Sequence, residues 1–251
     1  MKIAATIQAR MGSSRLPNKV LLPILGKPML ALQVERIRRS LLLDEVIIAT
    51  TTNPKDDAIE GLAHRLGVAC FRGSEERVLD RIVETLRHFE VDLQVEFYGD
   101  CPLPDPATID SIIGIYLKHQ SRYDCVCTGM KTTFPAGLDV NVYPASILYD
   151  VHNVVTRPEE REMVSMNIKR RKDRYRILNV EAPPWHRHPD LYLEVDTAED
   201  FKVVSAIYEA LYPSNPYFSL LHVIEFLKAN PMLAEANRGV ERRWKAFRED
   251  S

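Results

Sequence analysis

The first 34 residues of this chain contain no carboxylate. The first acidic residue is Glu35, whereas five cations precede it: Lys2, Arg10, Arg15, Lys19 and Lys27. The whole chain of 251 residues has a formal net charge of −2, so this excess of positive charge is local. A nearly neutral total argues against binding of nucleic acid or of a membrane over a large surface. The cations therefore point to a confined site for an anion.

Long apolar runs are also missing. No run of 18 apolar residues occurs, and this excludes a membrane-spanning helix of ordinary length. The apolar run at residues 2–7 is interrupted by Gln8 and Arg10, which makes it too short for a secretory signal. We therefore expect a cytoplasmic protein.

Cysteine is scarce, and its spacing fits neither a zinc knuckle nor a C-x-x-C redox pair. The four cysteines are Cys70, Cys101, Cys125 and Cys127. We interpret them as reduced thiols that pack in the interior. Nothing beside Cys101 in the sequence would lower its pKa, so we assign it packing and not nucleophilic attack.

The first half of the chain alternates short apolar runs with amphipathic segments. Strands are predicted at residues 2–8, 44–51, 68–71, 93–99 and 123–129, and helices at 29–42, 55–66, 75–89 and 106–120. This alternation predicts an α/β fold with a mainly parallel sheet and helices on both faces. Such sheets bind ligands beyond the carboxyl ends of their strands.

The second half is less regular. We predict a strand at 140–143, a charged helix at 159–172, strands at 176–182 and 191–195, and a helix at 198–211. No composition change marks an independent unit. We therefore expect a single domain over residues 1–251, with an irregular subdomain at about 130–190.

The loop after the first strand has the chemistry of a polyphosphate site. It combines Gly12 and Ser13 with Arg10, Arg15 and Lys19. Glycine allows the backbone to approach phosphate oxygens, backbone N–H groups bind them, and the cations neutralise their charge. The loop matches neither the Walker A pattern nor G-x-G-x-x-G. A solvated basic loop without a ligand is the alternative.

Two aspartates also follow predicted strands. Asp100 comes after the strand at 93–99, and Asp196 after the strand at 191–195. Mg²⁺ is commonly held by one or two carboxylates together with phosphate oxygens of a substrate. Each aspartate alone could instead cap a helix. Together with the basic loop they favour a site for a cation and a polyphosphate.

Several motifs occur together in this chain: ARMGSSRLPNKVL, LGKP, IATTTNPKDD, FRGSEERVLDR, GDCPL, FPAGLDV and VDTAED. This set resembles the sugar nucleotidyltransferases of the cytidylyltransferase group, most closely the spore coat polysaccharide biosynthesis protein F family. That family is related to the synthetases that make cytidine-monophosphate sugar acids. The resemblance implies a Rossmann-like three-layer α/β/α sandwich of the glycosyltransferase-A type.

The resemblance also implies residue roles. Nucleotide binding falls to Ala9, Arg10, Met11, Gly12, Ser13, Arg15, Lys19, Ser74 and Arg77, with Arg10, Lys19 and Asp100 as catalytic residues. Asp100 and Asp196 would bind Mg²⁺, and Pro135, Gly137, Asp139, Arg161 and Glu162 would lie near the sugar. The family commonly has acids where Ala136 and Asn141 stand here, and His where Met163 stands. A homodimer formed through residues 130–190 is a further expectation.

The function that follows is activation of a sugar, or a sugar phosphate, with a nucleoside triphosphate, CTP being favoured. Pyrophosphate would be released, and the product would serve surface polysaccharide or glycoconjugate synthesis. One alternative is a glycosyltransferase that consumes a nucleotide sugar, although Asp100 and Asp105 do not form its usual Asp-x-Asp motif. The other is a non-catalytic scaffold built on the same fold.

Overall fold

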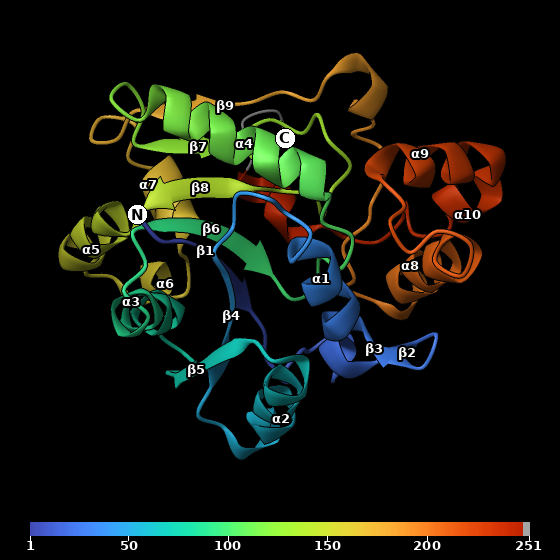
Figure 1. Cartoon of the computed structure of the whole chain (residues 1–251), viewed down its shortest axis with the longest axis horizontal. Helices are drawn as coiled ribbons and strands as arrows, with labels where there is room; N and C mark the ends of the chain where they lie inside the picture. The colour runs from blue at the N-terminus through green and yellow to red at the C-terminus, as the bar shows by residue number, and fades with distance from the viewer. Residues whose placement is uncertain (248–251) are drawn as a thin grey trace.

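The computed structural model describes residues 1–247 and is built around one seven-stranded sheet (Figure 1). Its strands lie in the order β5-β4-β1-β6-β8-β7-β9. Their bounds are β1 Ile3–Gln8, β4 Glu45–Thr51, β5 Ala69–Gly73, β6 Leu93–Tyr98, β7 Cys125–Cys127, β8 Asn141–Pro144 and β9 Ile177–Asn179. All pairings are parallel except those of β8, which runs antiparallel to β6 and β7. The prediction of a mainly parallel sheet is confirmed.

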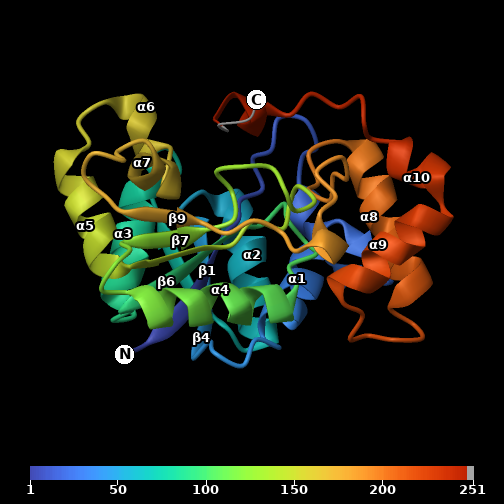
Figure 2. The same cartoon turned by 90° about the horizontal axis from the view of Figure 1, so that it is seen from above.

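Helices cover both faces of the sheet, which gives the three-layer arrangement (Figures 1 and 2). The helices are α1 Met29–Ile37, α2 Asp57–Leu66, α3 Val78–His88, α4 Pro106–His119, α5 Ala145–Val154, α6 Pro158–Arg161, α7 Ser165–Lys169, α8 Ala198–Leu211, α9 Leu220–Ala229 and α10 Pro231–Glu235. One core contains residues of α1, α2 and α4, and a second contains residues of α3, α5 and α7. No helix within residues 1–247 is long and apolar enough to cross a membrane.

The alternation of side chains along β1 explains why both faces need a cover. Ala5 and Ile7 point into the first core, whereas Ala4 points into the second. Ala5 pairs in register with Val46 of β4 and Val95 of β6, which belong to the same core. Strands buried on both faces read as continuous apolar runs, as the VIIA stretch of β4 does. In β6 the second face instead carries the buried polar residues Gln94 and Glu96.

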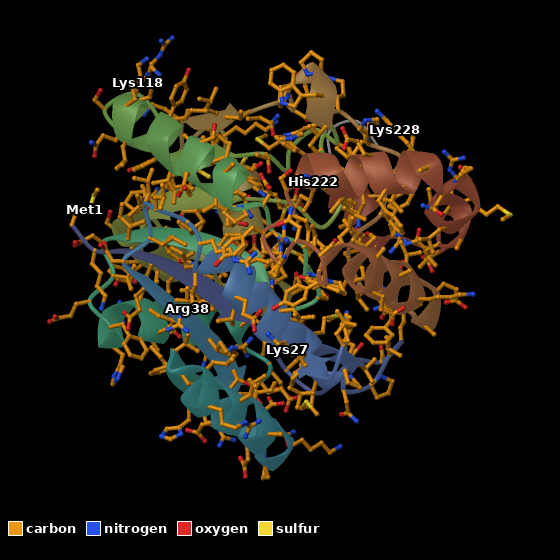
Figure 3. The ribbon with its side chains drawn as sticks, turned by 45° about the vertical axis from the view of Figure 1, so that its right-hand side comes forward. Met1, Lys27, Arg38, Lys118, His222 and Lys228 are labelled. Carbon is orange, nitrogen blue, oxygen red and sulfur yellow. The ribbon has the colours of Figure 1, made fainter. Side chains whose placement is uncertain are left out.

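A third core lies beside the sheet, where α8 and α9 pack against one side of α1. Figure 3 labels His222 and Lys228, which mark the two ends of α9. Leu193 and Val195 belong to this core, and the Val195 N–H donates to the carbonyl of Asp100 at 2.7 Å. Packing of α8 and α9 therefore brings the segment before Asp196 against the end of β6.

Two predicted elements of the second half are wrong. No strand forms at 191–195, where Tyr192 makes only an isolated bridge to Ala136 and Val195 bonds to the loop after β6. The helix predicted at 159–172 is divided into α6 and α7. It breaks there because Val164 has a non-helical backbone and the Asn167 amide donates to the carbonyl of Met163 at 2.7 Å.

Smaller elements complete the chain. A hairpin of β2 Pro23–Ile24 and β3 Lys27–Pro28 precedes α1. Single-turn helices lie at η1 Lys19–Leu21, η2 Pro54–Asp56, η3 Pro184–His186 and η4 Arg243–Phe247. All four cysteines are free thiols, with Cys125 and Cys127 buried and Cys70 and Cys101 half-buried.

Candidate active site

The basic loop follows β1 and is held in shape by its own backbone. The carbonyl of Met11 accepts the N–H groups of Ser13 at 2.9 Å and Asn18 at 3.2 Å. The N–H of Met11 donates to Asp56 at 2.8 Å, which ties the loop to η2, the single-turn helix after β4. Asn18 adopts the left-handed conformation that asparagine tolerates, and η1 begins directly after it with Lys19.

Lys19 lies between the two aspartates that the sequence singles out. Its Nζ donates to Asp100 Oδ2 and to Asp196 Oδ1, both at 2.9 Å, and to the carbonyl of Val195 at 2.7 Å. Burial of Lys19 disfavours its charged form, but the two carboxylates outweigh this and raise the pKa of the ammonium group. A protein cation therefore balances the carboxylates in this structure.

Arg15 extends this cluster toward the end of the chain. Its guanidinium pairs with Asp196 Oδ2 at 2.6 Å and donates to the carbonyl of Glu241 at 3.0 Å. Arg10 is exposed and forms no ion pair within residues 1–247. Among residues 1–247, the loop therefore has one unpaired cation, Arg10, while Arg15 and Lys19 both pair with Asp196.

A cavity of about 410 Å³ opens over this loop. Of the predicted nucleotide-binding residues, it is lined by Ala9, Arg10, Gly12, Ser13, Arg15 and Lys19. Met11 packs instead against the first core. Asp100 and Asp196 both reach the cavity wall, so the structure brings the loop and the carboxylates into one site.

Ser74 and Arg77 are not part of this cavity wall. The Ser74 hydroxyl accepts the N–H of Arg77 at 3.0 Å at the start of α3, and Arg77 pairs with Asp80 at 2.5 Å. Val78 and Arg81, further along the same helix, line the cavity instead. The four-residue spacing from Arg77 to Arg81 is the sequence signal that could have identified Arg81, because it spans about one turn.

Arg81 is a buried cation that lies beside the basic loop in the first cavity. It is 2% exposed, its Nη1 donates to the carbonyl of Ser74, and its Nε has no hydrogen-bond partner in residues 1–247. Burial, and then the neighbouring charge of Arg10, lower the pKa of Arg81 to about 10. It remains charged at neutral pH, and an anion in the cavity would offset both effects.

A second cavity of about 330 Å³ adjoins the first. Gln8, Tyr98, Asp100, Glu162 and Asp196 line both. Of the predicted sugar-side residues, Gly137, Asp139 and Glu162 line it. Pro135 is buried elsewhere, and Arg161 pairs with Asp80 at 2.7 Å.

The second cavity contains buried polar atoms without partners. Both side-chain polar atoms of Asn141 and the Oε2 of Glu194 have no hydrogen-bond partner within residues 1–247. Lys169, 9% exposed, forms no hydrogen bond or ion pair with these residues either. Buried polar groups are almost always paired, so these atoms have hydrogen-bonding capacity for a polar ligand or for water. Asn141 and Met163 both lie here, where the sequence departs from the family pattern.

A buried carboxylate, Glu96, holds two side chains that line both cavities, Gln8 and Tyr98. Glu96 is fully buried and accepts from Gln8 at 2.9 Å, from the hydroxyl of Tyr98 at 2.9 Å and from that of Tyr143 at 3.0 Å. Burial and the charge of Glu96 raise the pKa of Tyr98. Tyr98 is therefore a neutral hydrogen-bonding group in the site.

The second cavity depends on a glycine in the left-handed region. Gly137 has φ +89°, and a Cβ there would lie 2.5 Å from the backbone nitrogen of Glu194. No side chain fits in that space. Gly137 thus allows the segment at 136–139 to cross residues 193–194 directly at the cavity.

Metal binding by protein groups alone is not supported in the described chain. Within residues 1–247, no group of three or more His, Cys, Asp or Glu side chains is placed to hold a metal ion. Asp100 and Asp196 supply hard carboxylate oxygens but would need further ligands. Two carboxylates with phosphate oxygens and water form the donor set that Mg²⁺ prefers.

A basic loop after β1, two neighbouring carboxylates and a mainly parallel sheet agree with the class of nucleotidyltransferases. A family model described as cytidylyltransferase matches residues 4–213. The chain belongs to this cytidylyltransferase family.

Relatives agree with this assignment. The spore coat polysaccharide biosynthesis protein SpsF of Bacillus subtilis (strain 168) is 34% identical over 230 residues, which cover 90% of this chain and 93% of that protein. The solved structure of a cytidylyltransferase from Leptospira borgpetersenii serovar Hardjo-bovis (strain JB197) has a TM-score of 0.89 at 28% identity, covering 96% of this chain and all of that one.

A more distant structure shares the fold. CMP:2-keto-3-deoxy-manno-octonic acid synthetase, solved in complex with CTP, has a TM-score of 0.62 at 21% identity and covers 83% of this chain and 99% of its own. The Rossmann-like three-layer fold expected from the sequence is confirmed.

Proposed function

We propose that this protein transfers the cytidylyl group of CTP to a sugar or sugar phosphate and releases pyrophosphate, for the synthesis of a surface polysaccharide or glycoconjugate. The observation that carries the proposal is the junction of two cavities at Asp100 and Asp196. One cavity has the chemistry for a triphosphate and the other for a polar acceptor. The names of the relatives support both assignments.

The first cavity would hold the nucleotide. Arg10, Arg15, Lys19 and Arg81 would neutralise the phosphates, while N–H groups of the loop at residues 9–15 would bind phosphate oxygens. CTP is favoured over other nucleotides by family membership.

The second cavity would hold the acceptor. The Asn141 amide both donates and accepts, and the carboxylates of Asp139 and Glu162 accept, so together they suit sugar hydroxyls. Lys169 would pair with an acidic group of the acceptor. Met163 contributes an apolar part of the wall.

We further propose Mg²⁺ as the cofactor, held by Asp100 and Asp196. When bound, the ion would supply charge neutralisation at the phosphates. Lys19 now occupies the space between these carboxylates, so it would exchange them for phosphate oxygens when the nucleotide enters.

The reaction would be an in-line displacement at the α-phosphorus. A bond from the acceptor oxygen to the α-phosphorus forms, and the bond from that phosphorus to the bridging oxygen of pyrophosphate breaks. A hydroxyl acceptor releases its proton to water, whereas a sugar phosphate attacks as the anion. Arg10, Arg15 and Lys19 would stabilise the charge that grows on pyrophosphate. As in other phosphoryl transfers, the protein mainly positions the reactants and offsets charge.

The test combines nucleotide binding with turnover. Isothermal titration with CTP, GTP, UTP and ATP, each with Mg²⁺, should give selective binding of CTP. Release of pyrophosphate is then assayed against a panel of sugar acids and sugar phosphates. Asp100→Asn should lower turnover roughly 100-fold or more, the order seen when one charge-stabilising group is lost.

The matched control is Asp57→Asn, because Asp57 pairs with Arg72 on the surface and lies outside both cavities. It should leave turnover unchanged. Near-normal turnover of Asp100→Asn would show that this mechanism is wrong. Failure to bind any nucleotide would favour the scaffold alternative.

A further inference from the structure

The segment after α10 returns to the active site although it lies outside the family match at residues 4–213. We call residues 237–245 the C-terminal strap. Figure 2 shows it passing back from α10 toward the centre of the molecule, on the side where the loop after β1 lies. Arg243 lines the first cavity, and Trp244 lines the second.

Buried polar contacts fix the start and middle of the strap. Arg242 is 5% exposed as a residue, and its Nη2 donates to Asp200 at 2.7 Å and to the carbonyl of Asn237 at 3.0 Å. The Asn237 amide donates to Asp200 at 2.8 Å and to the carbonyl of Tyr192 at 3.0 Å. Burial works against the charge of Asp200, but Arg242 outweighs it and lowers the pKa of that carboxyl.

These contacts join the strap to the segment that carries Asp196. Asp200 lies in the first turn of α8 and accepts the N–H of Asp196 at 3.0 Å and of Thr197 at 2.9 Å. Asp200 thus binds the strap and the Asp196 backbone at once. A continuous set of hydrogen bonds through Asp200 therefore connects the strap to the backbone of Asp196.

Two further contacts tie the strap to the cavities themselves. Arg15 of the basic loop donates to the carbonyl of Glu241 at 3.0 Å. The indole N–H of Trp244 donates to Glu194 Oε1 at 2.9 Å, and Glu194 lines the second cavity. The strap is thereby in direct contact with the nucleotide side and the acceptor side.

Arg243 differs from its neighbour Arg242 because its charge is available. It is exposed, it faces the first cavity, and it forms no ion pair with any residue of 1–247. Arg10, Arg15, Lys19 and Arg81 line the same cavity, so Arg243 adds a cation from a distant part of the chain. A cluster of cations with few carboxylates suits a polyphosphate.

We propose that the C-terminal strap is a working part of the site, in which Arg243 binds the polyphosphate of the nucleotide and Trp244 forms a wall of the acceptor cavity. The proposal rests on the proposed function for the identity of the ligand. It adds two binding residues that lie beyond the part of the chain matched by the family model.

The experiment compares Arg243→Ala with Arg238→Ala by isothermal titration with CTP and with CMP, in Mg²⁺. Arg238 belongs to the same strap but pairs with Glu235 on the surface, which makes it the matched control. Arg243→Ala should weaken CTP binding about tenfold, as expected for loss of one charged hydrogen bond. CMP has one phosphate, so its affinity should change less.

Unchanged CTP affinity in Arg243→Ala would overturn the role of Arg243 while leaving the proposed function in place. An equal loss with CMP would also overturn it, because the contact would not be with the polyphosphate. If the unaltered protein binds CTP no better than CMP or not at all, the proposed function fails and this inference fails with it.

Tryptophan fluorescence tests the role of Trp244. The chain has two tryptophans, and the other, Trp185, is 61% exposed and lines neither cavity. In Trp185→Phe, CTP with Mg²⁺ should change the emission, because only Trp244 then reports and the residue directly before it, Arg243, would contact the nucleotide. In Trp244→Phe the change should be absent. A silent Trp185→Phe variant, under conditions where titration shows CTP bound, would overturn the placement of Trp244 at the working site.

Discussion

Lys19 balances the negative charge of Asp100 and Asp196. The family resemblance implies that Lys19 neutralises phosphate and that Asp100 and Asp196 bind a metal ion. In the structure the Nζ of Lys19 lies 2.9 Å from an oxygen of each carboxylate. A cation between two acids removes the repulsion that they would otherwise exert on each other and on a phosphate.

Replacement of Lys19 should therefore raise the affinity for a metal ion and lower the affinity for the nucleotide. In Lys19→Met the carboxylates lose a competing cation, so Mn²⁺ without nucleotide should bind about tenfold more tightly, a change of about 1.4 kcal/mol. CTP binding should weaken, because a phosphate partner is lost. Titration calorimetry with Mn²⁺ and then with CTP measures both.

The control is Lys27→Met. Lys27, labelled in Figure 3, also pairs with a carboxylate, Glu35, but lies on β3 and lines neither cavity. Its replacement should change neither affinity. Equal Mn²⁺ affinity in Lys19→Met and the unaltered protein would contradict the assignment of Asp100 and Asp196 as the metal ligands.

For single residues, the sequence motifs predict which side chains line the site to within about one turn of helix. They identify Arg10, Arg15, Lys19, Asp100 and Asp196 correctly as neighbours in space. The motifs point to Arg77 as a nucleotide-binding residue, but it is Arg81 that lines the cavity. The start of α3 determines which of these side chains points inward. Helix starts depend on caps and tertiary contacts that a periodic pattern does not contain.

At the scale of elements, the parallel half of the sheet was predictable because its strands alternate with helices along the chain, and because β1 and β4 bury apolar side chains on both faces. The antiparallel placement of β8 could not be predicted, since strand pairing depends on contacts between residues that are distant in sequence. The strand predicted at 191–195 does not form for the same reason. Its apolar residues are buried by α8 and α9 without sheet pairing.

One ion pair attaches helix α5 to the segment before β9, and it should respond to pH. Asp150 accepts from Arg174 at 2.7 and 2.6 Å and from Tyr175 at 2.6 Å. These bonds, Arg174 first, lower the pKa of Asp150 from 3.8 to about 2. A lowered carboxyl pKa contributes stability above about pH 4, which is lost as pH falls toward 2.

Asp150→Asn should thus lower Tm by a few degrees near pH 7, with the difference from the unaltered protein disappearing between pH 4 and 2. Thermal unfolding followed by circular dichroism across that range measures it. Asp173→Asn, an exposed neighbour, is the control and should show no such trend. A pH-independent difference would mean that the charge of Asp150 is not the cause.

At the scale of the whole molecule, the homodimer expected from the family resemblance remains a prediction. The segment at 130–190 exposes Trp185, which is 61% exposed on η3. Tryptophan is enriched at protein interfaces. Light scattering should give twice the chain mass of 28.7 kDa, and Trp185→Ser should shift the equilibrium toward the monomer.

Met232→Ser serves as its control, because Met232 is 90% exposed but lies outside that segment. A monomer at working concentration in the unaltered protein would contradict the predicted dimer. A dimer insensitive to Trp185→Ser would place the interface elsewhere.

The C-terminal strap is one of the last segments of the chain to be synthesised. Ribosomes make a chain from its N-terminus, and segments fold as they emerge. The basic loop is therefore made early, whereas Arg242, which locks Asp200 and reaches Glu194, is made more than two hundred residues later. Until then Asp200 and Glu194 have no cation from the strap. On the proposed role of the strap, the nascent protein would carry an incomplete nucleotide site until residues 237–245 have been made.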